Sequence, residues 1–319
     1  SRGLGDVYKR QAHAWGDGFV RIIKGGFHDA PYGVGKELAN AAPLIMTGLS
    51  VAFAFKTGLF NIGAAGQYTL GAYGALYCAI MLKMPWYVCL IVATILGGIW
   101  GAIPGFFKAY FNINEVITSI MFNWIGLYLV NELIYQNGTG PMYDVRNTRT
   151  LNLSKNAEFA QSIIPDFGLN KMFQTNSTTI AIFLAAAVAI LIWVILNKTT
   201  FGYELKAVGL NKSAARYAGI KDKRNIVLSM AIAGALAGAG AALYYLSGNT
   251  EFFWSTYQTL PAEGFNGIPV ALLAVNNPIA VIFTAIFMSV LDIAGLQLTN
   301  LTAYNEYICL LYTSDAADD

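Results

Sequence analysis

Residues able to carry acid–base or metal chemistry are few in this sequence and lie far apart. The two histidines, His13 and His28, share one Gly-rich stretch, and the three cysteines are widely separated. Catalytic sets and metal sites bring several such side chains together, often at short and recurring spacings. We therefore predict no enzyme activity, no metal site and no disulfide framework; the cysteines are Cys78, Cys89 and Cys309.

Three acidic residues adjoin long apolar stretches, where a charge is costly and often functional. They are Glu115, Glu132 and Asp292. Glu115 follows Asn114, and a carboxylate there also favours the amino end of a helix, so helix capping and ion transport both stay open. Glu132 could be interfacial, and Asp292 has no evident cation near it in the sequence.

Polar and glycine residues interrupt the apolar sequence once in each half of the chain. The first interruption is Phe60 to Gln67, and the second covers Asn266 to Pro269 and Asn276 to Pro278. Backbone at membrane depth can leave helix geometry only where protein or water satisfies it. Paired interruptions indicate a transport pathway, although a tight turn would explain either one alone. We expect four side chains to line a polar cavity: Asn61, Gln67, Asn123 and Asn266.

A basic segment at residues 197–224 predicts two short helices lying across a membrane face. A break is expected at Gly209, and the second helix should cover Ser213–Ala218, with Asn211 as its cap and Gly219 at its end. A soluble partner could contact these helices, although a solvated loop would carry the same charge. The residues expected at that contact are Lys206, Gly209, Asn211, Lys212, Ala215, Arg216 and Gly219.

The composition places these features in a lipid bilayer. Hydrophobic residues make up 56% of the 319 residues and charged residues only 12%, against about 25% charged in a soluble domain. The net charge of +2 leaves no basic excess for nucleic acid. Apolar stretches of about 20 residues predict an all-α polytopic bundle, with spans at 41–55 and its flanks, 67–82, 86–107, 116–135, 178–196 and 226–246, and an interrupted span at 268–291.

Glycines within these spans have a simpler explanation than function. They occur at positions 97, 98, 101 and 105 and again at 234, 238 and 240. No Lys-Ser or Lys-Thr follows them, so they do not form a phosphate-binding loop. Such small residues indicate close packing of membrane helices.

Lys and Arg collect in cytoplasmic loops and orient the bundle. Residues 197–224 contain seven of them, whereas the longer segment 138–176 contains four. We therefore predict that 197–224 is cytoplasmic and 138–176 extracytoplasmic. Alternation then places 109–114 inside, 56–66 at the cytoplasmic side or dipping into the membrane, and 83–85 and 12–36 outside.

The two ends of the sequence differ from the rest. A DNA sequence that encodes Asp6 to Gln11 has a complementary strand that, read in another frame, encodes Cys309 to Ser314. One short DNA element can therefore encode both ends. We interpret residues 1–11 as doubtful or adapter-derived and 309–319 as an adapter-derived scar. We expect a single transmembrane domain at 12–308, truncated at both ends, with one helix lost before it and at least one after it.

Three motifs, in this order, resemble the permeases of ATP-binding-cassette (ABC) importers for branched-chain amino acids, ribose and nucleosides. GLFNIGAAGQ at 58–67 resembles the family's GLFNIGAEGQ, and EGFNGIPVALLAVNNP at 263–278 resembles its GFDGIAVALLG-type stretch. Residues 201–220 resemble its coupling segment, and INEVITSIMFNW at 113–124 supports the match. The GLFNIG form is most similar to the sugar and nucleoside branch, especially purine nucleosides. The departures are Ala65, Asn266, Pro269 and Ala274.

The resemblance implies a type II ABC-importer-like permease fold with broken or re-entrant helices, in the bacterial plasma membrane. It implies three partners: an ATPase subunit that holds Mg-ATP, a second permease that is identical or homologous, and an extracytoplasmic lipoprotein that delivers a nucleoside or simple sugar. The chain itself would hydrolyse nothing and need no cofactor. Residues 211–220 would dock into the ATPase, with Lys212 and Arg216 near acidic residues. The alternative is an ion-coupled secondary transporter, which would need a carboxylate such as Asp292 or Glu115.

Overall fold

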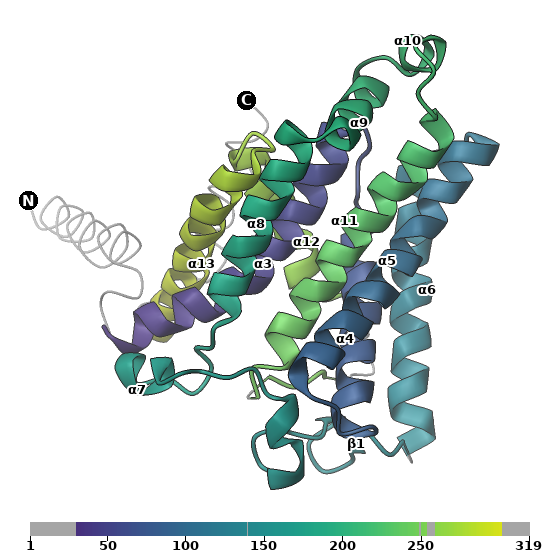
Figure 1. The fold of residues 1–319 in the computed structure, drawn as a ribbon. Helices are drawn as coiled ribbons and strands as arrows, with labels where there is room; N and C mark the ends of the chain where they lie inside the picture. Colours follow the sequence, from purple (N-terminus) through teal and green to yellow (C-terminus); the bar gives the residue numbers. More distant parts are fainter. Residues whose placement is uncertain (1–29, 139, 249, 254–258, 302–319) are drawn as a thin grey trace, which may run out of the picture.

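The computed structural model describes residues 30–301 except 139, 249 and 254–258 (Figure 1). Within these residues the fold is a helix bundle, and its sheet is a small hairpin of β1 (Tyr143–Asp144) and β2 (Arg149–Thr150). The all-α prediction is therefore confirmed. Predictions for residues 1–29 and 302–319, which include both interpreted scars and both histidines, lie outside the described residues.

Six helices of the described chain are long and apolar enough to cross a membrane. Five match predicted spans, and the sixth is the second part of the interrupted span. They are α3 (Tyr32–Lys56), α5 (Trp86–Phe111), α6 (Glu115–Tyr135), α8 (Ala181–Lys198), α11 (Asp222–Tyr245) and α13 (Pro278–Leu301). The protein is therefore a multi-pass membrane protein.

Two shorter helices, α4 (Ala64–Ile80) and α12 (Ala262–Leu273), correct the predicted spans. The 17 residues of α4 reach about 26 Å at 1.5 Å per residue, which is short of the ~30 Å hydrocarbon core. Pro269 was expected to interrupt its span, but it lies inside α12. Prolines are tolerated in membrane helices where neighbours satisfy the freed carbonyl, so the break falls at residues 274–277 alone.

Glycines bring α4, α5 and α11 into backbone contact in the bundle. A Cβ placed on Gly97 would lie 2.4 Å from the carbonyl oxygen of Gly234, and one on Gly71 would lie 2.4 Å from the Cα of Gly238. No side chain fits between backbones at these distances. The prediction that these glycines serve close helix packing is confirmed.

One end of the bundle carries the basic segment, and we name it the cytoplasmic end because Lys and Arg gather there. It holds α9 (Thr200–Leu210) and α10 (Lys212–Tyr217) (Figure 1). The Lys223 ammonium lies 5.0 Å from the centroid of the Tyr110 ring, at the end of α5. Residues 109–114 and 197–224 therefore share one end, as predicted.

The opposite end, here the outer end, gathers the loops expected outside. It includes η3 (Gln136–Gly138), the β1–β2 hairpin, η4 (Ala157–Ser162) and α7 (Leu169–Phe173). The Ser162 hydroxyl donates to the carbonyl of Met84 at 2.6 Å, and the Thr178 hydroxyl donates to the carbonyl of Gly35 at 3.0 Å. The first bond joins segment 138–176 to the loop at 81–85. The second joins the following segment, 175–181, to the start of α3.

Candidate functional site

Residues 57–63, which join α3 to α4, form the first break in the bundle, here the α3–α4 break. It turns at Gly58, whose φ of +73° is a left-handed conformation that glycine adopts readily. The buried amides of Asn61 and Gln67 pair with each other: Asn61 Nδ2 donates to Gln67 Oε1 at 2.8 Å, and Gln67 Nε2 donates to Asn61 Oδ1 at 3.0 Å. Asn61 Nδ2 also donates to the hydroxyl of Ser50 at 3.0 Å. Side chains from α3 and α4 thus fasten this break.

Asn123 on α6 holds the same break from another side. Its Oδ1 accepts from the backbone N–H of Gly66 at 2.9 Å, and its Nδ2 donates to the carbonyl of Ile62 at 3.0 Å. Three of the four side chains predicted to line a cavity therefore surround one turn and bond to each other or to backbone. The fourth, Asn266, is half-buried on α12. Their role in a substrate pathway stays a prediction.

Helix α9 touches the α3–α4 break directly. A Cβ on Gly58 would lie 2.6 Å from the Cα of Gly209, and one on Gly209 would lie 2.7 Å from the backbone nitrogen of Gly58. The Thr57 hydroxyl also hydrogen bonds to that of Ser229 on α11. The predicted break at Gly209 is wrong, because Gly209 lies within α9 and the chain breaks at Asn211. The missing side chain of Gly209 instead permits a backbone contact.

Helix α10 has the predicted local structure. The side chain of Asn211 accepts from the backbone N–H of Ala214 at 3.0 Å, which makes it the cap of this helix. Gly219 follows the helix with a φ of +83°. The helix bounds, Lys212–Tyr217, differ by one residue from those expected.

The basic side chains of α10 pair within the chain. Arg216 donates to Asp222 Oδ2 at 2.6 Å, and Lys212 Nζ lies 3.8 Å from the same oxygen. The hydrogen bond and the charge of Asp222 raise the pKa of the Arg216 guanidinium. An acidic partner residue would therefore compete with Asp222 for these two cations.

Two apolar side chains of this surface are almost fully exposed, and the sequence analysis missed them. Tyr217 is 96% exposed and Leu210 is 88% exposed, on either side of the Asn211 cap. Contiguous apolar patches on a surface can mark a protein contact, whereas single exposed apolar residues are ordinary. Ala215, which was expected at that contact, is buried against Val208 and Ile226. The segment contains other apolar residues, among them Leu205 and Val208, which are buried, so the sequence alone did not single out Leu210 and Tyr217.

Lys206 faces a different part of the cytoplasmic end. Its Nζ donates to Asn197 Oδ1 at 3.3 Å. With Lys56 and Asn277 it lines a cavity of about 140 Å³ between α3, α8, α9 and the start of α13. Its contact with a partner stays a prediction.

Glu115 and Glu132, two of the three acidic residues that adjoin apolar stretches, lie at opposite ends of α6. Glu115 is the first residue of α6 and pairs with Lys108 at 2.8 Å, beside the cap in which Asn114 accepts from the N–H of Val116. This arrangement favours the helix-end explanation. Glu132 is exposed near the outer end of α6.

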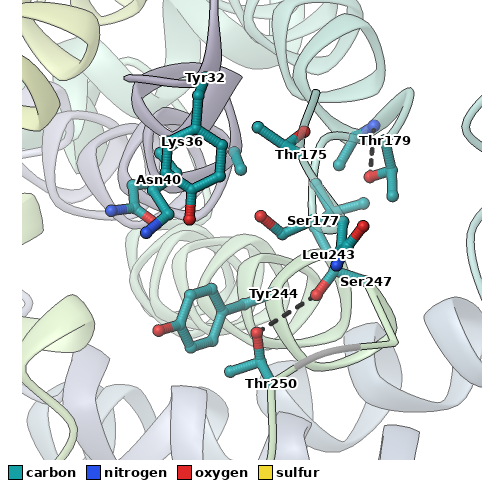
Figure 2. A pocket seen from close by; sticks show the side chains of 13 residues that line it. Tyr32, Lys36, Asn40, Thr175, Ser177, Thr179, Leu243, Tyr244, Ser247 and Thr250 are labelled. Atoms are coloured by element: carbon teal, nitrogen blue, oxygen red, sulfur yellow. Dashed lines mark hydrogen bonds between the residues drawn. The ribbon is translucent and has the colours of Figure 1, made fainter. Parts of the chain in front are cut away.

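A polar pocket of about 290 Å³ opens at the outer end between α3, the 175–181 segment and the end of α11 (Figure 2). Its polar lining consists of hydroxyls, amides and one ammonium group. The hydroxyls belong to Tyr32, Thr175, Ser177, Thr179, Tyr244, Ser247 and Thr250, the amides to Asn40 and Asn176, and the ammonium to Lys36. Such a lining can exchange hydrogen bonds with a neutral polar solute, and the two tyrosine rings offer flat apolar faces.

Comparison with known proteins agrees with this architecture. The family described as "Branched-chain amino acid transport system / permease component" matches residues 35–312. The chain is 35% identical to the guanosine ABC transporter permease protein NupP of Bacillus subtilis, over 88% of this chain and 78% of that protein. It is 36% identical to the nucleoside ABC transporter permease protein NupB of Lactococcus lactis, over 84% and 73% of the two chains.

A third relative has a different named substrate. The glucose ABC transporter permease protein TsgB13 of Haloferax volcanii is 30% identical over 88% of this chain and 73% of its own. No solved structure matches the chain. The family match covers both breaks, the coupling segment and the outer pocket from Lys36 onward. The chain therefore belongs to the permease component family of branched-chain amino acid transport systems.

Proposed function

We propose that this protein is the permease subunit of an ABC importer that moves nucleosides across the bacterial plasma membrane into the cytoplasm. The observation that carries the substrate class is the similarity to two permeases named for guanosine and nucleosides, each over more than four fifths of this chain. The hydroxyl- and amide-lined outer pocket suits such a neutral, polar and partly aromatic solute.

The cytoplasmic end would be the part of the permease that the ATPase subunit moves. In this proposal an ATPase subunit, which holds the Mg-ATP, docks on the end of α9 through Leu210 and on α10 through Tyr217. Displacement of α9 then acts on the α3–α4 break, because Gly209 and Gly58 touch through their backbones. The amide pair of Asn61 and Gln67 passes the movement to α3 and α4.

The outer end would receive the solute. An extracytoplasmic binding lipoprotein would deliver it over the loops at 138–176, and a second permease, identical or homologous, would complete the pathway. The residues of this chain bind and move; hydrolysis would occur in the ATPase. The family is one of transport permeases, which supports a non-catalytic role.

ATP-dependent uptake of labelled guanosine in vesicles that contain the permease, its ATPase and its receptor tests the proposal. We expect uptake that disappears with an ATPase unable to hydrolyse ATP, and that falls at least about tenfold with Tyr217→Ala, as for loss of a central interface residue. Glucose uptake without nucleoside uptake would overturn the substrate class. Uptake driven by a proton gradient without ATP would overturn the importer.

A further inference from the structure

Two carboxyl groups lie inside the bundle beneath the outer pocket. Glu263, in the first turn of α12, lies near the Tyr244 hydroxyl and near Asp292 of α13. Both acidic side chains are partly buried. Ionisable groups in a membrane bundle are costly to keep, and they commonly belong to a solute or ion pathway.

The surroundings of the two carboxyl groups include one buried hydroxyl without a hydrogen-bond partner, that of Tyr68. Within the part of the chain that the structure describes, no Lys, Arg or His forms an ion pair with Glu263 or Asp292. Tyr68 of α4 is fully buried close to Glu263, and its hydroxyl has no hydrogen-bond partner. A buried phenol with no partner costs free energy, so a ligand with hydroxyl groups could satisfy both this donor and the carboxylates.

Tyr244 connects this site to the outer pocket. Its ring forms part of the pocket wall, and its hydroxyl points away from the bonded pair Ser247 and Thr250 (Figure 2). Tyr244 thus lies between the pocket, which its ring lines, and Glu263 at the start of α12.

We infer that Glu263, positioned by Tyr244, accepts hydrogen bonds from the vicinal hydroxyls of the ribose as a nucleoside leaves the outer pocket. This inference rests on the proposed function. A carboxylate has two oxygens and can accept from both hydroxyls of a cis-diol. The ammonium of Lys36 in the pocket disfavours entry of a cation, so the carboxylates are better suited to a neutral donor of hydrogen bonds.

The test compares a ribonucleoside with its analogue that lacks one hydroxyl. The permease is reconstituted with its partner permease, ATPase and receptor, and ATP-driven uptake of guanosine and 2′-deoxyguanosine is measured separately. For Glu263→Gln we expect guanosine uptake to fall about tenfold, because a hydrogen bond to a charge is lost, with 2′-deoxyguanosine uptake changing less than about twofold. The receptor is the same in every sample, so a changed ratio comes from the permease.

Two further variants make the result decisive. Tyr244→Phe should shift the ratio in the same direction by a smaller factor, and it provides the answer if Glu263→Gln does not reach the membrane. Glu132→Gln removes an exposed carboxylate of the same kind and should change neither uptake. An equal loss of both nucleosides, or an unchanged ratio in correctly inserted variants, would overturn the inference alone. Absence of nucleoside uptake by the wild-type complex would overturn the proposed function and the inference with it.

Discussion

The α3–α4 break and the turn at residues 274–277, here the α12–α13 break, both lie at the cytoplasmic end but are held in different ways. The first is fastened by the amide side chains of its own Asn61, of Gln67 on α4 and of Asn123 on α6, and it is touched by α9. The second is closed by its own backbone: Val275 N–H donates to Leu272 and Asn276 N–H donates to Ala271, both at 2.9 Å. Val275 is 76% exposed. The first break can therefore transmit movement between helices, whereas the second is a local turn.

The largest effect should come from separating α9 from the α3–α4 break. In Gly58→Ala a Cβ would meet the Cα of Gly209 at 2.6 Å and a left-handed φ would be strained. These two costs together amount to about 2–4 kcal/mol of unfolding free energy. Thermal unfolding in detergent measures this loss of stability, and ATP-driven uptake measures its effect on transport. Gly219→Ala is the matched control, since its φ is also left-handed but open space surrounds it. Equal losses in the two variants would mean that the backbone contact is unimportant.

A second comparison removes one asparagine from each break. Asn61→Leu leaves the buried amide of Gln67 unsatisfied, and we expect about 1–3 kcal/mol of destabilisation. Asn277→Ala removes only the cap at which its side chain accepts from the N–H of Ile279, which costs about 1 kcal/mol. Urea titration of both purified variants gives the two values. A greater loss for Asn277→Ala would reverse the proposed difference between the breaks.

A smaller effect is expected from the hydroxyl that joins α13 to α12. The Thr284 hydroxyl donates to the carbonyl of Val270 at 3.0 Å across the second break. Thr284→Val should lower the unfolding free energy by about 0.5–1 kcal/mol. Thr94→Val serves as the control, because the Thr94 hydroxyl bonds only within α5, to Leu90. Hydrogen exchange at residues 270–284 that stayed as slow as in the wild type would count against this cross-helix role.

The smallest effect concerns pH, because neither break contains an ionisable side chain. At the outer end, the hydrogen bond from Lys83 and its charge lower the pKa of Glu158 below its ordinary value of 4.5. The pair therefore stabilises the fold above the ordinary pKa, and this contribution is lost as pH falls through the lowered one. The acid sensitivity should vanish in Glu158→Gln and in high salt, since both partners are exposed. Persistence of the full transition in that variant would assign it to another carboxylate.

Local signals in the sequence predicted the features that depend on nearby residues. The polar run at 58–67 located the first break, Asn276 to Pro278 located the second, and Asn211 with Gly219 located the ends of α10. Each depends on the preferences of a few adjacent residues for caps, turns or left-handed backbone. The lengths of the apolar runs likewise gave the spanning helices.

Features that depend on the approach of distant segments could not be predicted. Gly209 looked like a break because glycine is a poor helix former, and only its contact with Gly58 explains its place inside α9. The bond from the Gly66 N–H to Asn123, which is 57 residues away, was hidden for the same reason, and the role of these amides in a cavity stays a prediction. The outer pocket joins segments as distant as Lys36 and Thr250.

The glycine contacts between α5 and α11 have a mechanical consequence. Flexible side chains between two helices act as a soft layer, but here Gly97, Gly101, Gly234 and Gly238 leave backbone against backbone. Such a pair behaves as one stiff strut, since sliding by even a fraction of a turn would bring Cβ atoms into these contacts. Motion during a transport cycle would then be confined to the helices around the strut, so distances measured between spin labels on α5 and α11 should be constant throughout the cycle.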